Sequence, residues 1–259
     1  MRAVRFAYPG AGDIYPEPGI SLTLSSGVTA LVGENGAGKT TLTKLLNGLL
    51  RPASGSVIVA GQEVADASVA KMARLVGYAF QNPDDQLFER TVAAEVAFGP
   101  RVLGRPPEQR ATDVARAMQL CGLAGREHVH PHDLGLAERK WVAIASALAT
   151  DAPVLVLDEP TLGQDFASRH RLRTLVERLA AEDRLVLVVT HDMDFVGEAC
   201  PTTVVLTHGT VRHAGPTDVG FKRPEMIREA GLEPPHVTSL ARELGLPPTV
   251  SAEGFLAEL

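Results

Sequence analysis

The chain has 259 residues, which is long enough for one α/β core and a smaller subdomain. Hydrophobic residues make up 45% and charged residues 22%, as in globular proteins, and a net charge of −6 argues against a nucleic-acid-binding surface. Two cysteines exclude a disulfide framework, and no apolar run reaches the roughly 18 residues that cross a bilayer, so a membrane role would require a partner.

Short β-branched runs alternate with helical patterns along the chain, which is typical of a parallel sheet covered by helices. The predicted strands end near Gly33, Phe80, Asp158, Thr190 and Leu206. Because ligands bind at the carboxyl ends of strands in open α/β sheets, these strand ends are where functional residues are expected.

The middle of the chain reads as helical rather than as alternating strands and helices. Two apolar sets with helical spacing are interpreted as core-facing stripes: Ala111, Val114, Met118 and Cys121, and then Trp141, Ile144, Ala145 and Leu148. After Pro216 the composition changes, and two short helices separated by Pro234 and Pro235 are expected. The sequence thus predicts a core of residues 1–81 and 151–215, a helical subdomain of residues 82–150, and a helical extension of residues 216–259.

Residues 33–41, GENGAGKTT, match the phosphate-loop pattern G-x-x-x-x-G-K-[ST], with a predicted strand before them and a helix after them. Glycines let the backbone approach phosphates closely, and the amides point inward at a helix N-terminus. Lys39 would supply charge to the β- and γ-phosphates, and the Thr40 hydroxyl would coordinate Mg²⁺. The predicted nucleotide-binding residues of this loop are Gly33, Glu34, Asn35, Gly36, Ala37, Gly38, Lys39, Thr40 and Thr41.

Two further strand ends carry candidate catalytic groups. The apolar run VLVLDEP delivers Asp158, a candidate Mg²⁺ ligand, and Glu159, which would orient or deprotonate the attacking water. His191 follows the next strand, where it could reach a γ-phosphate. Lys39, Glu159 and His191 are therefore the predicted catalytic residues.

Taken in order, these motifs resemble those of the ABC ATPase family over nearly the whole chain. The resemblance implies a RecA-like P-loop NTPase core with an inserted helical subdomain, binding of Mg-ATP, and a head-to-tail dimer with a second ATPase subunit. It implies that Tyr8 stacks on adenine and that Gln81 senses both Mg²⁺ and a transmembrane partner. Residues 161–165 occupy the D-loop position at the dimer interface.

Three stretches, RFAYPG, FQNPDDQLF and EAGLEPPHVTSLARELG, are similar to ATPases of energy-coupling factor (ECF) transporters, importers of vitamins and of cobalt or nickel ions. This resemblance implies a transmembrane coupling subunit that docks near Gln81–Gln86, and a separate substrate-binding membrane subunit. Asp84 and Asp85 are expected to face a basic residue of the coupling subunit. The expected location is the cytoplasmic face of the cell membrane, reached through partner subunits.

The chain departs from the family at the signature sequence LSGGQ, which caps the γ-phosphate held by the opposite subunit. The corresponding signature loop here is Leu134-Gly135-Leu136-Ala137-Glu138. Gly135 has no hydroxyl to donate, Leu136 adds a side chain where close approach is needed, and Glu138 adds negative charge. In the D-loop, Gly163-Gln164-Asp165 replaces GLD. The hypothesis is a heterodimer of ATPases with one competent and one degenerate site.

Two other functional classes share features with this sequence. A regulatory subunit that binds ATP with little hydrolysis is favoured by the degenerate signature and disfavoured by the presence of Glu159 and His191. A DNA-repair or ribosome-associated ABC ATPase is disfavoured because only about fifty residues, without heptads, separate Gln81 from Leu134.

Overall fold

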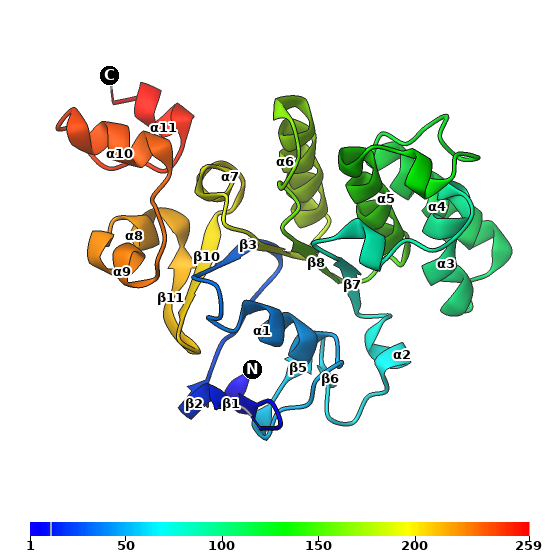
Figure 1. Cartoon of the computed structure of the whole chain (residues 1–259), viewed down its shortest axis with the longest axis horizontal. Coiled ribbons are helices and arrows are strands. Elements are labelled where there is room, and N and C mark those ends of the chain that lie inside the picture. Colours follow the sequence, from blue (N-terminus) through cyan, green and yellow to red (C-terminus); the bar gives the residue numbers. More distant parts are fainter. Residues whose placement is uncertain (11, 259) are drawn as a thin grey trace.

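The computed structural model describes residues 1–10 and 12–258, with a six-stranded sheet at its centre (Figure 1). Its strand order is β11-β10-β3-β9-β8-β7, and every neighbouring pair is parallel except β10 and β11. The strands are β3 (Gly27–Val32), β7 (Val76–Ala79), β8 (Val154–Asp158), β9 (Leu185–Val189), β10 (Thr202–Thr207) and β11 (Thr210–Pro216). The five predicted strands and the mixed α/β fold class are confirmed.

A second, antiparallel sheet lies below the first in Figure 1 and was not predicted. It consists of β1 (Arg2–Ala7), flanked by β2 (Asp13–Ile20) and β4 (Ser54–Ser56); β5 (Ile58–Val59) and β6 (Gln62–Glu63) form a separate hairpin. Helix α1 (Lys39–Leu46) lies between the sheets, and one apolar cluster joins Tyr15 of β2, Leu42 of α1 and Leu31 of β3. This packing fixes the helix that follows the phosphate loop.

Three helices, α3 (Val92–Val102), α4 (Pro107–Leu120) and α5 (Leu136–Ala149), pack together beside β7 and β8 (Figure 1). Nearly all of α5 from Lys140 onward is buried, so its predicted stripe lies inside a central helix. Met118 of α4 and Cys121, the residue after its last turn, are buried. Ala111 is exposed, contrary to the predicted core-facing stripe, because the first turns of α4 face solvent.

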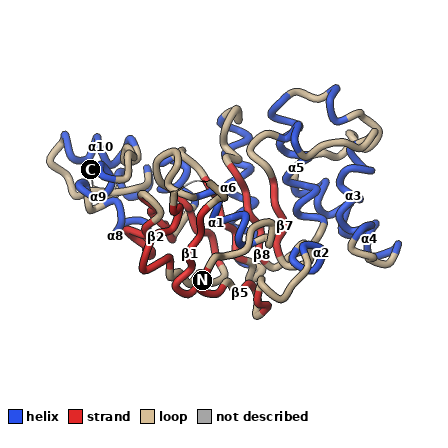
Figure 2. The backbone as a smooth tube through the Cα atoms, turned by 60° about the horizontal axis from the view of Figure 1, so that its bottom comes forward, coloured by secondary structure: helices blue, strands red, loops and turns tan. Residues whose placement is uncertain are grey.

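The remaining helices cover the sheet and form the C-terminal end: α2 (Val69–Met72), α6 (Phe166–Ala181), α7 (Met193–Ala199), α8 (Thr217–Phe221), α9 (Pro224–Glu229), α10 (His236–Glu243) and α11 (Ala252–Leu256). The segment after Pro216 thus holds four short helices rather than two, although Pro234 and Pro235 do separate α9 from α10. Figure 2 shows this segment and helices α3–α5 at opposite ends of the molecule. The division into three parts stays a prediction.

Candidate functional site

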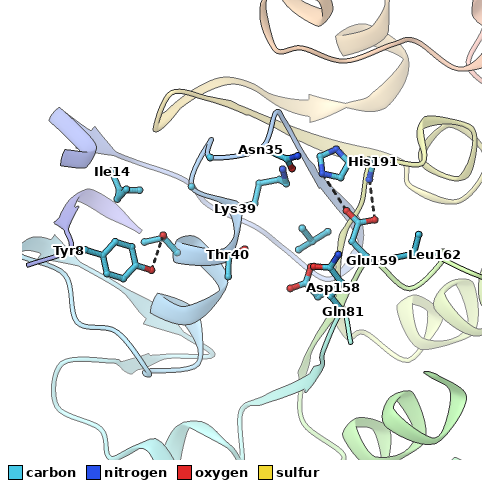
Figure 3. A pocket seen from close by; sticks show the side chains of 14 residues that line it. Tyr8, Ile14, Asn35, Lys39, Thr40, Gln81, Asp158, Glu159, Leu162 and His191 are labelled. Carbon is cyan, nitrogen blue, oxygen red and sulfur yellow. Dashed lines mark hydrogen bonds and ion pairs between the residues drawn. The ribbon is translucent and has the colours of Figure 1, made fainter. Parts of the chain in front are cut away.

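A cavity of about 590 Å³ lies where the central strands end, against the phosphate loop. Figure 3 shows Tyr8 and Ile14 at one end, the carboxylates of Asp158 and Glu159 at the other, and Lys39 between them. The lining residues are Tyr8, Ile14, Asn35, Gly36, Gly38, Lys39, Thr40, Thr41, Gln81, Asp158, Glu159, Leu162, Val189 and His191. The cavity therefore runs from an aromatic and apolar end to a polar, charged end.

The phosphate loop has a shape that only glycine allows at two of its positions. Gly33 has φ +150°, and a Cβ there would lie 2.0 Å from the carbonyl oxygen of Leu206 in β10. Gly38 has φ +101°, and a Cβ there would lie 2.8 Å from the Tyr15 ring, whose hydroxyl donates to the Gly38 carbonyl at 2.6 Å. The loop is thus pressed between both sheets, and α1 begins directly after it.

Lys39 carries the loop's positive charge and is 8% exposed. Its Nζ donates to the carbonyl oxygens of Gly33 at 2.6 Å and of Glu34 at 3.0 Å. Burial lowers the pKa of Lys39, and the nearby carboxylates of Glu159 and Asp158 oppose this effect. The loop therefore holds an ammonium group in place, pre-positioned for an anionic ligand.

Three residues predicted to bind nucleotide do not line the cavity: Gly33, Glu34 and Ala37. Gly33 and Ala37 are buried under the loop, and the Glu34 carboxylate turns away, to 3.1 Å from Nδ1 of His208. Gly33 has no side chain, and the side chains of Glu34 and Ala37 do not line the cavity, so a contribution from these three positions would come from the main chain.

Asp158 is a half-buried carboxylate whose Oδ2 accepts a hydrogen bond from the Tyr78 hydroxyl at 2.9 Å. Burial raises the pKa of Asp158, and Tyr78, Lys39 and Lys140 lower it. The Asp158 carboxylate, the Thr40 hydroxyl and the Gln81 amide line the same cavity and offer the oxygen ligands that Mg²⁺ prefers. The donor set fits a hard divalent cation.

Glu159 is held from several sides at the end of β8. Its Oε2 accepts from the Thr190 hydroxyl at 3.2 Å and from the His191 amide at 3.4 Å, and its Oε1 lies 3.5 Å from Nε2 of His191 (Figure 3). Burial raises the pKa of Glu159, and His191 opposes that rise. A carboxylate with a raised pKa at a cavity wall has the properties of a general base.

Tyr8 lies at the opposite end of the cavity from these carboxylates. Its ring contacts Phe6 edge to face with centroids 4.9 Å apart, and its hydroxyl lies 3.3 Å from the Thr41 hydroxyl. The ring is half-buried and forms part of the cavity wall, where a planar base could stack.

A profile of the ABC transporter family matches residues 18–162, more than half of the chain. The chain belongs to the ABC transporter family. A relative from Pyrococcus furiosus, named as a candidate ABC transporter ATP-binding protein, is 42% identical over 237 residues, covering 92% of this chain and 90% of that protein. An energy-coupling factor transporter ATP-binding protein from Methanoculleus marisnigri is 39% identical over 235 residues, covering 90% of this chain and 85% of its own.

Solved structures agree with this assignment. The structure of cbiO1 from Clostridium perfringens, described as part of the ABC transporter complex cbiONQ, superimposes with a TM-score of 0.78 at 28% identity, covering 95% of this chain and 97% of that chain. The chain is therefore an ABC ATPase, an ATP-hydrolysing protein of the transport type, and the expected resemblance is confirmed.

The signature loop of this ABC ATPase lies at the start of α5 and does not line the chain's own cavity. Gly135 is the N-cap without a side-chain cap, and the Leu136 side chain is 48% exposed. Glu138 lies 3.1 Å from Nη2 of Arg126, so part of the charge that it adds is neutralised within the chain. The Gln164 amide donates to the Ala137 carbonyl at 3.3 Å, which joins the D-loop to the signature loop.

In the docking segment predicted at Gln81–Gln86, two polar side chains make contacts within the chain. The Asp84 carboxylate accepts from Nη1 of Arg139 at 2.8 Å and stays exposed, so its contact with a basic residue of a coupling subunit stays a prediction. The Gln86 side chain bridges the Phe80 amide and the Ala143 carbonyl. Asp85 remains exposed beside an apolar groove of about 460 Å³ between β7 and the helices α3 and α5.

The sequence did not single out four residues at or behind the site: Ile14, Tyr15, Tyr78 and Lys140. Leu162 was expected only at the dimer interface, and Thr190 only as the end of a strand. Ile14 and Tyr15 belong to the unpredicted strand β2. Tyr78 carried a usable signal, since it is a polar aromatic within a predicted strand that neighbours the strand of Asp158. Lys140 is a lysine within an apolar helix, which also signals a buried partner.

Proposed function

We propose that this chain is the ATP-binding and ATP-hydrolysing subunit that energises an ECF-type importer of a vitamin or a transition-metal ion. The observation that carries the proposal is the single cavity that brings together Lys39, Asp158, Glu159 and His191 behind a glycine-shaped loop. The similarity to proteins named as energy-coupling factor transporter ATP-binding proteins supports the transport class.

The cavity gives each part of Mg-ATP a place. Adenine would stack at Tyr8 and Ile14, and the phosphates would lie on the loop with the Lys39 ammonium beside the β- and γ-phosphates. Thr40, Gln81 and Asp158 would hold Mg²⁺, which when bound supplies positive charge to the phosphates.

At the other end of the cavity, Glu159 would orient or deprotonate the attacking water and would be held in place by Thr190 and His191. His191 would also stabilise negative charge on the γ-phosphate. This division of roles places the proton acceptor and the cationic groups on opposite sides of the reacting phosphate.

The proposed partners follow from the surfaces outside this cavity. A second ATPase subunit would bind head to tail, with the signature loop of each chain facing the nucleotide of the other. This chain's cavity, capped by an intact partner signature, would be the competent site, and the loop Leu134–Glu138 would complete a degenerate one. Gly135 and the exposed Leu136 support this asymmetry, because they replace phosphate donors with an apolar side chain.

The membrane partners would use a different face. The groove beside Asp85 would receive a helix of a transmembrane coupling subunit, and a separate membrane subunit would bind the transported substrate. No helix among the described residues has both the length and the apolar character needed to span a membrane. The proposed location is accordingly the cytoplasmic face of the cell membrane, with attachment through these subunits.

The test of the proposal measures ATP binding and ATP turnover by the chain alone and with a candidate partner ATPase. We expect Mg-dependent ATP binding in both samples and turnover only in the mixture. Failure of calorimetry to detect ATP binding in either folded sample would refute the ATPase assignment, and rapid turnover by the chain alone would refute the heterodimer.

A regulatory ATP-binding subunit is the second candidate, and the altered signature loop favours it. It would bind ATP in the assembled complex without turnover at this cavity. The carboxylate and histidine pair at Glu159 and His191 favours hydrolysis instead, because a purely structural ATP site has no use for a positioned base.

A further inference from the structure

Lys140 is a buried cation that none of the roles above explains. It lies in the second turn of α5, is 4% exposed, and does not line the nucleotide cavity. Its Nζ donates to the main-chain carbonyl of Glu159 at 2.7 Å, and within residues 1–10 and 12–258 no carboxylate forms an ion pair with it. Because burying an ammonium group is costly without compensation, a specific interaction must keep it there.

Its acceptor is a residue with an unusual backbone. Glu159 has φ +46°, in the left-handed region that few residues other than glycine adopt. The Glu159 amide donates to the Val189 carbonyl of β9 at 2.8 Å, while the Glu159 carbonyl accepts from Lys140 of α5. The peptide is thus held from both sides, so that its side chain reaches Thr190 and His191.

We propose that Lys140 is a positioning residue that fixes the Glu159 main chain so that the carboxylate points into the nucleotide cavity. The inference rests on the proposed role of Glu159 as the base. Lys140 also connects this carboxylate to α5, whose first turn follows the signature loop. In the proposed dimer that loop faces the partner's nucleotide, so Lys140 links the two nucleotide sites of the dimer.

The charge of Lys140 acts on the same carboxylates. Burial raises the pKa of both Asp158 and Glu159, and the Lys140 cation lowers the pKa of Asp158. The groups that face these carboxylates come from four elements: Lys39 of α1, Tyr78 of β7, Lys140 of α5, and Thr190 and His191 after β9. These two carboxylates in turn stabilise the Lys140 cation, whose pKa is lowered by burial.

The experiment compares Lys140→Met, Lys140→Gln and Lys140→Arg in whichever form of the full chain hydrolyses ATP. Glu159→Gln serves as the reference, and Lys71→Met, at an exposed lysine of α2, serves as the matched control. We expect Lys140→Met to lower turnover roughly 10- to 100-fold, as small displacements of catalytic groups do, with ATP affinity changed by less than about twofold. Lys140→Arg should recover most of the turnover, because it keeps both charge and donor.

Two readouts separate positioning from mere folding: a fall in turnover without a matching fall in ATP affinity, and recovery of turnover in Lys140→Arg. Lys140→Gln, which keeps an uncharged donor, should retain more turnover than Lys140→Met. Should Lys140→Met fail to fold, Lys140→Gln carries the same test. A folded variant with wild-type turnover overturns the inference, as does a loss of turnover that Lys140→Arg does not relieve.

The reference variant Glu159→Gln distinguishes failure of the proposed base from failure of the proposed positioning residue, Lys140. Normal turnover by Glu159→Gln would remove the proposed base and the inference with it. Inactive Glu159→Gln beside fully active Lys140→Met would leave the base in place and reject only the role of Lys140.

Discussion

Replacing Glu159 by Gln tests the chemistry of the site with little change in shape. In the native chain Oε2 accepts hydrogen bonds from the Thr190 hydroxyl at 3.2 Å and the His191 amide at 3.4 Å. The Gln carbonyl oxygen can accept both bonds, and its amide can face Nε2 of His191, which lies 3.5 Å from Oε1. The substitution thus removes the proton acceptor while retaining the local packing.

The magnitude follows from the role. Positioned general bases contribute about 10²- to 10⁴-fold, which corresponds to about 3 to 5 kcal/mol of transition-state stabilisation. ATP affinity should remain close to the wild-type value, because the hydrogen bonds that hold Lys39 to the carbonyls of Gly33 and Glu34 do not involve Glu159. The pattern expected is therefore a large fall in turnover with nearly unchanged binding.

The assay is steady-state phosphate release by the assembled ATPase, with ATP binding measured by calorimetry on the same preparation. Glu177→Gln is a suitable control, because Glu177 is an exposed carboxylate of α6 that pairs with Arg173 far from the cavity. Turnover by Glu159→Gln within about threefold of wild type would refute the assignment of the base, since that is much less than the contribution of a general base.

Three further predictions address the loop, the carboxylates and the signature. Gly33→Ala should abolish ATP binding and lower the melting temperature, because the new Cβ would lie 2.0 Å from the Leu206 carbonyl oxygen. Gly135→Ala is the control and should change neither property, because Gly135 has open space around it and φ −64°. Equal effects of the two substitutions would contradict the close packing of the phosphate loop. Burial raises the pKa of Glu159, so the folded chain binds this proton more tightly than the unfolded chain does. The stabilisation from protonated Glu159 is fully present below the ordinary carboxylate pKa and is lost as the pH rises through the pKa of Glu159 in the folded state. Glu159→Gln should therefore melt above wild type at about pH 8 and by a smaller margin at about pH 4, and a larger margin in acid would contradict the raised pKa. Converting residues 135–138 to Ser-Gly-Gly-Gln should raise turnover of the assembled complex by up to about twofold by restoring phosphate donors at the second site, whereas unchanged turnover would argue against a degenerate site.

The central sheet and the phosphate loop could be predicted because their signals are local. The strand before Gly33 and the helix after Lys39 flank a pattern whose glycines and lysine have one common structural context. The antiparallel sheet could not be predicted in the same way. Strand β2 contains two prolines and a glycine, and register shifts interrupt its pairing with β1, so the alternation of buried and exposed residues is lost.

The candidate site was predicted for residues that end strands and was missed for residues that act across the chain. Tyr78 reaches Asp158 from 80 positions away, and Arg139 reaches Asp84 from 55 positions away. Neither pairing can be recognised from the spacing of the sequence, because the first depends on how β7 pairs with β8 and the second on how α5 packs against the turn Pro83–Asp85.

Tyr78 lies between the nucleotide cavity and the segment proposed for membrane docking. One phenol touches Thr43 of the helix behind the phosphates and Asp158 of β8, while the backbone of the same strand leads directly to the segment proposed for membrane docking. In the proposed complex, a displacement of that segment would reach Asp158 through this short and largely buried strand. Docking of a membrane subunit would then change the geometry of the nucleotide cavity without any rearrangement of the fold.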